Sequence, residues 1–304
     1  MPNISAKIGK LTLKNPVLTA SGTFGYGNEY NRIYDVSKLG GVVTKSVSRY
    51  ERKGNKPQRI VETPSGMLNA IGLANVGVER FISEKLEFLQ KLETSVISNV
   101  VGSSLQEYVE VTEMLEAQDG IAGYEINLSC PNVKHGTAFS SDPKLAFQMI
   151  QAIKNVVKSD RPVIAKLTPN VTSVAEIAKA CEDAGADSVS LINTLIGIVI
   201  DIKTRKPKIK NVTGGLSGPA IRPVAIAKVW EVRKSVKIPI VGIGGIMTWE
   251  DAIEFFIAGA TAIQVGTANF VNPNAPLEIL EGIENYLSKN KIENLSELVG
   301  SLEV

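Results

Sequence analysis

The chain has 304 residues, of which 44% are hydrophobic and 21% are charged, and it contains 26 glycines. This composition is typical of a globular protein and excludes a disordered, fibrous or coiled-coil chain. Because 33 basic residues nearly balance 31 acidic ones, to a formal net charge of +2, neither nucleic acid nor an anionic membrane is expected as the main ligand. The length fits one α/β barrel or two modest domains.

The N-terminal region has lysines within its first 14 residues, where an export signal would need an unbroken apolar stretch. The longest uncharged apolar run, residues 188–200, is too short to cross a bilayer. The two cysteines provide neither a disulfide framework, nor a zinc pattern, nor the ligands of an iron–sulfur cluster. A cytoplasmic location is therefore expected.

Short β-branched runs alternate with stretches of helical periodicity, the pattern of parallel βαβ units. After a hairpin over residues 4–13 that closes the barrel floor, strands are expected at 16–20, 41–47, 96–102, 124–130, 162–167, 188–194, 239–244 and 262–267. Helices are expected at 78–92, 104–118, 143–159, 173–184, 223–236, 249–258 and 275–287, and an excursion after the sixth strand at 200–215. Eight repeats without a linker predict one (β/α)8 TIM barrel, a single domain over residues 1–304.

Polar residues and glycines follow the expected strands where each strand ends. These carboxyl ends meet at one rim of a barrel, where active sites lie. The endings are Ser21-Gly22, Lys45-Ser46, Asn99, Asn127 with Cys130, Lys166, Asn193-Thr194, Gly244-Gly245 and Gly266-Thr267. Since buried polar groups destabilise a fold unless they are paired, their convergence indicates a binding site.

The endings of the seventh and eighth strands, Gly244-Gly245 and Gly266-Thr267, predict a phosphate site, because bare backbone amides there bind a phosphate monoester. Either pair alone could simply make a tight turn. The phosphate could belong to a substrate or to a cofactor such as FMN. Lys166 would then face the negative charge at the pyrimidine edge of a reduced flavin.

Cys130 ends a strand and precedes Pro131, which stops further ladder pairing. A thiol there could act as a nucleophile or as a general base. Cys181, in contrast, lies at core positions of an amphipathic helix and is interpreted as a buried hydrophobe. The single histidine, His135, is interpreted as a solvent-exposed loop residue.

Neutral amides at Asn69, Asn127, Asn132 and Asn193 suit a planar ligand with alternating C=O and N–H groups, such as a pyrimidine ring. The glycine-rich segment 65–77 is expected to be a long loop that covers the site. No cluster of histidines and carboxylates follows the strands, so no metal site is expected.

These motifs resemble those of the class 1 dihydroorotate dehydrogenases over nearly the whole chain. The similarity rests on NPVLTASGTFGYG, GGVVTKSV, ETPSGMLNAIGLANVGV, NLSCPNVKHG, PVIAKLTPN, LINT, TGGLSGPAIRP and GIGGIMTWEDAIEFFIAGATAIQVGTANF. The segments ETPSGMLNAIGL and TGGLSGPAIRP look most like the NAD-linked type B branch and less like the fumarate-linked type A branch. One departure is Val76-Gly77-Val78, where many relatives carry a proline.

The resemblance implies a TIM barrel that binds FMN and oxidises dihydroorotate to orotate in pyrimidine biosynthesis. Cys130 would remove the C5 proton while hydride passes from C6 to flavin N5, and Lys45 would also be catalytic. FMN contacts are implied for Ser21, Lys45, Ser46, Asn99, Asn127, Lys166, Ile192, Gly218, Gly244, Gly245, Gly266 and Thr267. Substrate contacts are implied for Lys45, Asn69, Ala70, Ile71, Gly72, Leu73, Asn127, Asn193 and Thr194.

A type B enzyme passes electrons to NAD, yet this chain has no dinucleotide fingerprint, because Met247 stands where the third glycine is needed. The resemblance therefore implies a separate iron–sulfur flavoprotein subunit with FAD and a [2Fe–2S] cluster, in a heterotetramer of two subunits of each kind. The alternatives are a fumarate-linked type A homodimer, an enzyme for another dihydropyrimidine, a phosphate-binding barrel without redox chemistry such as an isomerase or lyase, and an inactive scaffold.

Overall fold

A computed structural model describes residues 2–129 and 139–304. Eight parallel strands close into a barrel with the hydrogen-bonded order β3-β4-β7-β8-β9-β10-β15-β16 and back to β3. The strands are β3 (Val17–Thr19), β4 (Gly41–Val43), β7 (Ser95–Val100), β8 (Gly123–Asn127), β9 (Val163–Leu167), β10 (Ser188–Leu191), β15 (Ile240–Ile243) and β16 (Ala262–Val265). The predicted (β/α)8 TIM barrel is confirmed.

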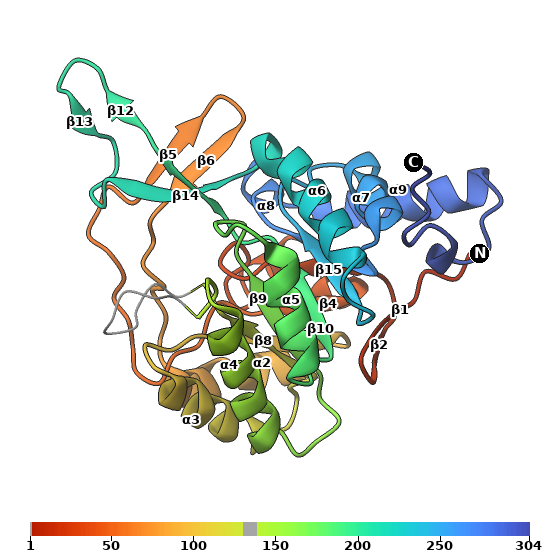
Figure 1. Cartoon of the computed structure of the whole chain (residues 1–304), viewed down its shortest axis with the longest axis horizontal. Helices are drawn as coiled ribbons and strands as arrows, with labels where there is room; N and C mark the ends of the chain where they lie inside the picture. Colours follow the sequence, from red (N-terminus) through yellow and green to blue (C-terminus); the bar gives the residue numbers. More distant parts are fainter. Residues whose placement is uncertain (1, 130–138) are drawn as a thin grey trace.

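Helices surround the barrel (Figure 1). They are α1 (Val78–Glu84), α2 (Leu86–Gln90), α3 (Leu105–Glu116), α4 (Pro143–Val156), α5 (Val174–Asp183), α6 (Arg222–Arg233), α7 (Trp249–Ala258), α8 (Ala268–Val271) and α9 (Ala275–Lys289). Short 3-10 helices occupy Tyr30–Arg32, Val36–Lys38, Pro219–Ile221 and Leu295–Glu297. The helix expected at 78–92 is divided at Lys85. In the part of the chain that the structure describes, no helix is long and apolar enough to cross a membrane.

Successive strand residues face opposite sides of the barrel wall, which explains why the strands are apolar throughout. Leu18, Val43 and Ile97 pack inside the barrel together with Ile8 and Leu13. The last two residues belong to the hairpin of β1 (Ala6–Ile8) and β2 (Leu11–Leu13), so the predicted hairpin is present and fills one end of the interior.

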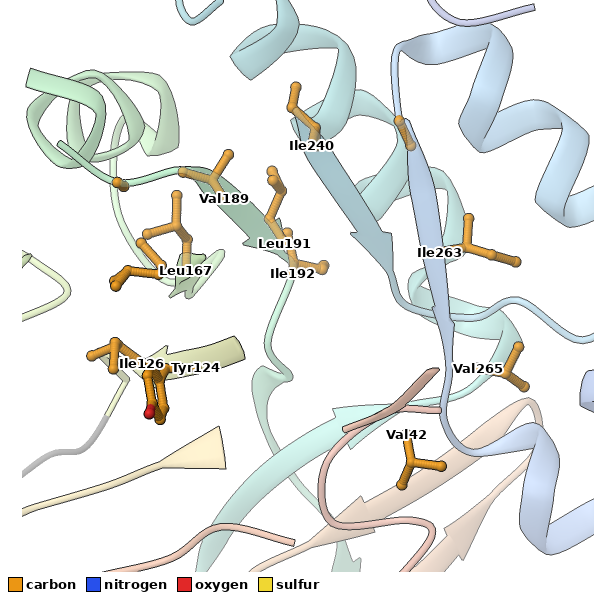
Figure 2. Packing of buried hydrophobic residues seen from close by; sticks show 14 of the residues in the cluster. Val42, Tyr124, Ile126, Leu167, Val189, Leu191, Ile192, Ile240, Ile263 and Val265 are labelled. Carbon is orange, nitrogen blue, oxygen red and sulfur yellow. The ribbon is translucent and has the colours of Figure 1, made fainter. Parts of the chain in front are cut away.

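The outward-facing strand residues form a second apolar layer beneath the helices. Figure 2 shows part of this layer, with Val42, Tyr124, Ile126, Leu167, Val189, Leu191, Ile240, Ile263 and Val265, together with Ile192 just after β10. Cys181 of α5 belongs to the same layer and is fully buried. This burial confirms its interpretation as a core residue, and it raises the pKa of the thiol to about 12.

A four-stranded antiparallel sheet, which we call the arm, projects from the barrel (Figure 1). Its order is β11 (Leu195–Ile198), β14 (Thr213–Ser217), β6 (Gly66–Asn69) and β5 (Ile60–Thr63), and the hairpin of β12 (Ile200–Asp201) and β13 (Lys206–Pro207) extends from it. The expectation of a loop over 65–77 was therefore wrong for its first part, and the excursion is longer than residues 200–215. The arm pairs Asn69 with Gly215, a contact between segments so distant that no local pattern signals it.

Candidate active site

A cavity of about 380 Å³ lies at the carboxyl ends of the barrel strands, between them and the arm. Its volume is in the range of small-molecule sites. Of the predicted site residues, the cavity is lined by Ser21, Lys45, Ser46, Asn69, Ala70, Ile71, Gly72, Leu73, Asn127, Lys166, Ile192, Asn193, Thr194, Gly218, Gly244, Gly245, Gly266 and Thr267. Residues from both long excursions and from the carboxyl ends of most of the barrel strands, or just after those ends, thus converge on one space.

Among the described residues, one predicted site residue, Asn99, does not line this cavity. Cys130, Asn132 and His135 lie outside the described residues. Asn99 is fully buried. Its side chain lies between those of Ser46 and Glu125. Ser46 Oγ donates to Asn99 Oδ1 at 2.7 Å, and Asn99 Nδ2 donates to Glu125 Oε1 at 2.7 Å. Asn99 therefore supports a cavity-lining residue from below.

Most of the barrel strands end earlier than the sequence pattern predicted, whereas β9 ends at Leu167 as expected. Strand β4 ends at Val43 rather than Val47, and β10 ends at Leu191 rather than Thr194. The residues beyond these ends, among them Lys45 and Asn193, line the cavity. The prediction extended the strands because an apolar run gives no sign of where ladder pairing stops.

The two glycines after β15 have backbone conformations that favour glycine, with φ of +124° at Gly244 and +77° at Gly245. A Cβ atom on Gly245 would lie 2.8 Å from the backbone nitrogen of Arg222. At Gly266, after β16, a Cβ atom would come no closer than 3.4 Å to another residue, so its absence leaves open space at the cavity wall. Backbone can therefore approach a ligand closely at both strand ends.

The N–H groups of Gly244, Gly245, Gly266 and Thr267 donate to no acceptor within residues 2–129 and 139–304. Because these residues line the cavity, their amides are free to bind an anion. Unpaired backbone donors from two adjacent strand ends fit a phosphate monoester. This donor set meets the requirement that the phosphate of FMN would impose.

Among the described residues, Lys45 and Lys166 are the two lysines that line the cavity. Burial lowers the pKa of Lys45, and the positive charge of Arg59 lowers it further. The Nζ atom of Lys45 has no hydrogen-bond or ion-pair partner in the described parts of the chain. Lys166, in contrast, forms an ion pair with Glu125, with 3.1 Å between Nζ and Oε1.

Glu125 is a buried residue that the sequence analysis missed. It lies in the middle of β8, and its side chain is fully inaccessible. Burial alone would raise the pKa of its carboxyl, but the charge of Lys166 and hydrogen bonds from Gln264, Lys166 and Asn99 together lower it. A charged residue between Tyr124 and Ile126 in a buried strand is the signal that could have found it.

The cavity brings together two of the predicted amides. Asn193 Nδ2 donates to Asn127 Oδ1 at 3.4 Å, while Asn127 Oδ1 also accepts from the backbone N–H of Ser129 at 3.2 Å. Asn69 reaches the cavity from the arm, where its Nδ2 donates to the backbone oxygen of Gly215 at 3.2 Å. Donors and acceptors thus face the cavity from the barrel and from the arm, which suits a flat polar ligand.

Comparison with known proteins identifies the family to which this site belongs. The family model described as dihydroorotate dehydrogenase matches residues 3–287. The chain is 53% identical over 302 residues to a protein from Geotalea uraniireducens named dihydroorotate dehydrogenase B (NAD(+)), catalytic subunit, covering 99% of this chain and 98% of that protein.

A protein of the same name from Thermodesulfovibrio yellowstonii is 52% identical over 304 residues, which cover all of this chain and 100% of that protein. Another from Geobacter sulfurreducens is 51% identical over 304 residues, which cover all of this chain and 99% of that protein. The resemblance seen in the sequence motifs is therefore confirmed, including its emphasis on type B. The chain belongs to the dihydroorotate dehydrogenase family of oxidoreductases.

Proposed function

We propose that this protein is an FMN-dependent catalytic subunit that oxidises (S)-dihydroorotate to orotate, a step of UMP synthesis, and passes the electrons to NAD through a partner subunit. The observation that carries the proposal is one cavity in which unpaired backbone donors of the β15 and β16 ends face the same space as Lys45, Lys166 and the side-chain amides. A phosphate-binding barrel without redox chemistry would need only the first of these groups.

The backbone amides after β15 and β16 would hold the FMN phosphate, together with Gly218 and the hydroxyl of Thr267, whose Oγ1 donates to Ser217 Oγ at 2.8 Å. Ser21, Lys45, Ser46, Asn127, Lys166 and Ile192 would surround the rest of the cofactor. Asn99 would act through Ser46. When bound, FMN supplies the acceptor for the hydride that leaves the substrate.

The substrate would bind between Asn127, Asn193 and Thr194 of the barrel and the arm segment 69–73. The amides would pair with the alternating C=O and N–H groups of the dihydropyrimidine ring. Lys45 would face the negative charge of the substrate, since it is cationic, partly buried and without another partner in the described residues.

Cys130 would take the C5 proton of dihydroorotate as the general base, while hydride leaves C6 for flavin N5. This role rests on the sequence, in which Cys130 follows Asn127 by three positions, and Asn127 lines the cavity. A thiolate is a suitable base near its ordinary pKa of about 8.5.

The relatives are named catalytic subunits of NAD(+)-dependent enzymes, which supports a partner for this chain. We propose an iron–sulfur flavoprotein subunit that carries FAD and a [2Fe–2S] cluster, in a heterotetramer with two subunits of each kind. The cytoplasmic location expected from the sequence stays a prediction.

An anaerobic absorbance titration of the purified chain with dihydroorotate tests the function. We expect a yellow protein that is bleached by dihydroorotate, is not reoxidised by fumarate, and is reoxidised by NAD only after the partner subunit is added. Rapid reoxidation by fumarate would indicate a type A enzyme. A colourless protein would favour a phosphate-binding barrel without redox chemistry.

The role of Cys130 can be tested with a matched pair of cysteine variants. Cys130→Ala should slow flavin reduction by dihydroorotate by roughly 10²–10⁴-fold, the contribution of a general base, while FMN remains bound. Cys181→Ala, a change of the same atoms in the core, should leave the rate of flavin reduction within a few fold. An unimpaired Cys130→Ala enzyme would contradict the assignment.

A further inference from the structure

The carboxylate of Glu125 accepts hydrogen bonds from four side chains on four different strands of the barrel. Its Oε1 accepts from Asn99 Nδ2 at 2.7 Å and from Lys166 Nζ at 3.1 Å, and its Oε2 accepts from Ser190 Oγ at 2.9 Å and from Gln264 Nε2 at 2.5 Å. A carboxylate with two donors on each oxygen is held in its ionised form and in one orientation.

This carboxylate is connected to the cavity at two points. Lys166 is its direct partner and lines the cavity with a side chain that is 7% exposed. Ser46, which also lines the cavity, is reached through Asn99. The position of the Lys166 ammonium group is therefore fixed from below by a group that itself has no contact with solvent.

Stability alone does not account for the ion pair. Burying two charges costs desolvation free energy, and well-packed apolar residues in place of a buried pair are often neutral or stabilising. Among the described residues, the other buried carboxylate is Asp251, which pairs with Arg222 and accepts from the backbone N–H groups of Met247 and Thr248 at the start of α7. Glu125 differs because its ionic partner lines the cavity.

We propose that Glu125 is a positioning residue that holds the Lys166 ammonium group at the cavity floor and offsets its charge, and that it thereby sets the reduction potential of the bound flavin. The inference rests on the proposed FMN site. A cation beside a flavin favours the reduced, more negative form, and a compensating anion weakens that preference. Glu125 thus lowers the potential that Lys166 alone would impose.

The experiment measures the midpoint potential of FMN in the full chain by anaerobic dye titration for wild type and Glu125→Gln, which removes the charge and keeps the shape. We expect a more positive potential, with the ratio of the affinities for reduced and oxidised FMN raised at least tenfold. For a two-electron couple a tenfold change is about 30 mV. Glu125→Asp, which keeps the charge, should shift the ratio by less than threefold.

Glu116→Gln is the matched control. Glu116 is also a largely buried carboxylate, and it accepts from Tyr124 Oη at 2.7 Å and pairs with Arg161, but it does not line the cavity. Its replacement should lower the melting temperature and leave the potential unchanged. Glu125→Gln could instead lower the melting temperature in the same way and leave the ratio of the affinities for reduced and oxidised FMN within twofold of the wild-type value. Glu125 would then be only structural, and the inference would be overturned.

Should Glu125→Gln fail to fold, Ser190→Ala carries the test, because it removes one neutral donor from the same carboxylate and changes no charge. With one hydrogen-bond donor fewer, the negative charge of Glu125 should act more strongly on Lys166 and on the flavin. The ratio of the affinities for reduced and oxidised FMN should then shift at least twofold toward oxidised FMN, and an unchanged ratio would overturn the inference. A wild-type chain that binds no FMN would overturn the proposed function as well, whereas a normal wild-type potential that does not respond to these variants would overturn only the role of Glu125.

Discussion

The two ends of the barrel differ in how completely their polar groups are paired. At the amino-terminal end of the strands, Arg161 just before β9 donates to the backbone oxygens of Leu115, Glu116 and Gln118, to the carboxylate of Glu116 and to Tyr124 Oη, at 2.7–3.4 Å. At the carboxyl end, Lys45 Nζ and the N–H groups of the glycines after β15 have no partner in the described residues.

This difference separates stability from ligand binding along one set of strands. Paired polar groups contribute to the stability of the fold, whereas unpaired donors are kept available for a ligand and make no such contribution. Strand β8 contributes to both stability and ligand binding. Tyr124 accepts a hydrogen bond from Arg161, while Asn127, three residues later, lines the cavity. Variants at the two ends should therefore affect different measurements.

The largest effect is expected for Lys45→Met at the cavity. Loss of this cation should reduce kcat by at least about 10²-fold, as for other lost electrostatic contacts to a reacting group. Thermal stability should not fall, because burial of Lys45 opposes its charged form. Steady-state kinetics and calorimetry measure the two quantities, and Lys10→Met, at a position whose side chain is 72% exposed, is the control. A parallel loss of stability would show that Lys45 is structural.

The reverse behaviour is expected for Arg161→Met. This change removes the side-chain donor of three backbone carbonyl groups and one of the several donors to the Glu116 carboxylate, so the free energy of unfolding should fall by about 2–3 kcal/mol. Urea denaturation measures this loss, while kcat should remain within a few fold of wild type. Lys179→Met, which breaks the pairs that the half-exposed Lys179 side chain forms with Glu182 and Asp183, should cost less than about 1 kcal/mol.

A third test inserts a methyl group at the phosphate site. Gly245→Ala places a Cβ atom against Arg222 at a φ of +77°, which should cost about 1–2 kcal/mol of stability and weaken FMN binding. Gly185→Ala has a similar φ of +93° but meets nothing closer than 3.8 Å and is not at the cavity. Equal FMN affinity in the two variants, measured by fluorescence titration, would argue against a phosphate site after β15.

The smallest effect concerns the pH dependence of stability at the amino-terminal end. Burial alone would raise the pKa of Glu116, but hydrogen bonds from Tyr124 and Ser159 and the charge of Arg161 bring it below its ordinary value of 4.5. Because the folded-state pKa is depressed, the contribution of Glu116 is present above pH 4.5 and is lost as the pH falls through the folded-state value. The stability difference between wild type and Glu116→Gln should therefore shrink between pH 6 and pH 3. A constant difference would contradict this linkage.

Local patterns in the sequence determined the barrel and most of the cavity residues. Strand and helix periodicities predict eight repeats, and the glycines after the last two strands, with the lysines after β4 and in β9, predict where a ligand binds. These inferences succeed because the carboxyl ends of parallel strands meet at one rim whatever the details of packing.

The tertiary structure alone decided what depends on distant pairing. The arm joins β6 to β14, and Glu125 collects donors from four other strands. Neither the arm nor this set of donors could be found from periodicity within one segment. The same holds for Asn99, which follows the pattern of a rim residue but lies beneath Ser46. Periodicity reports which face a residue occupies, whereas closure of the barrel determines which side chains meet.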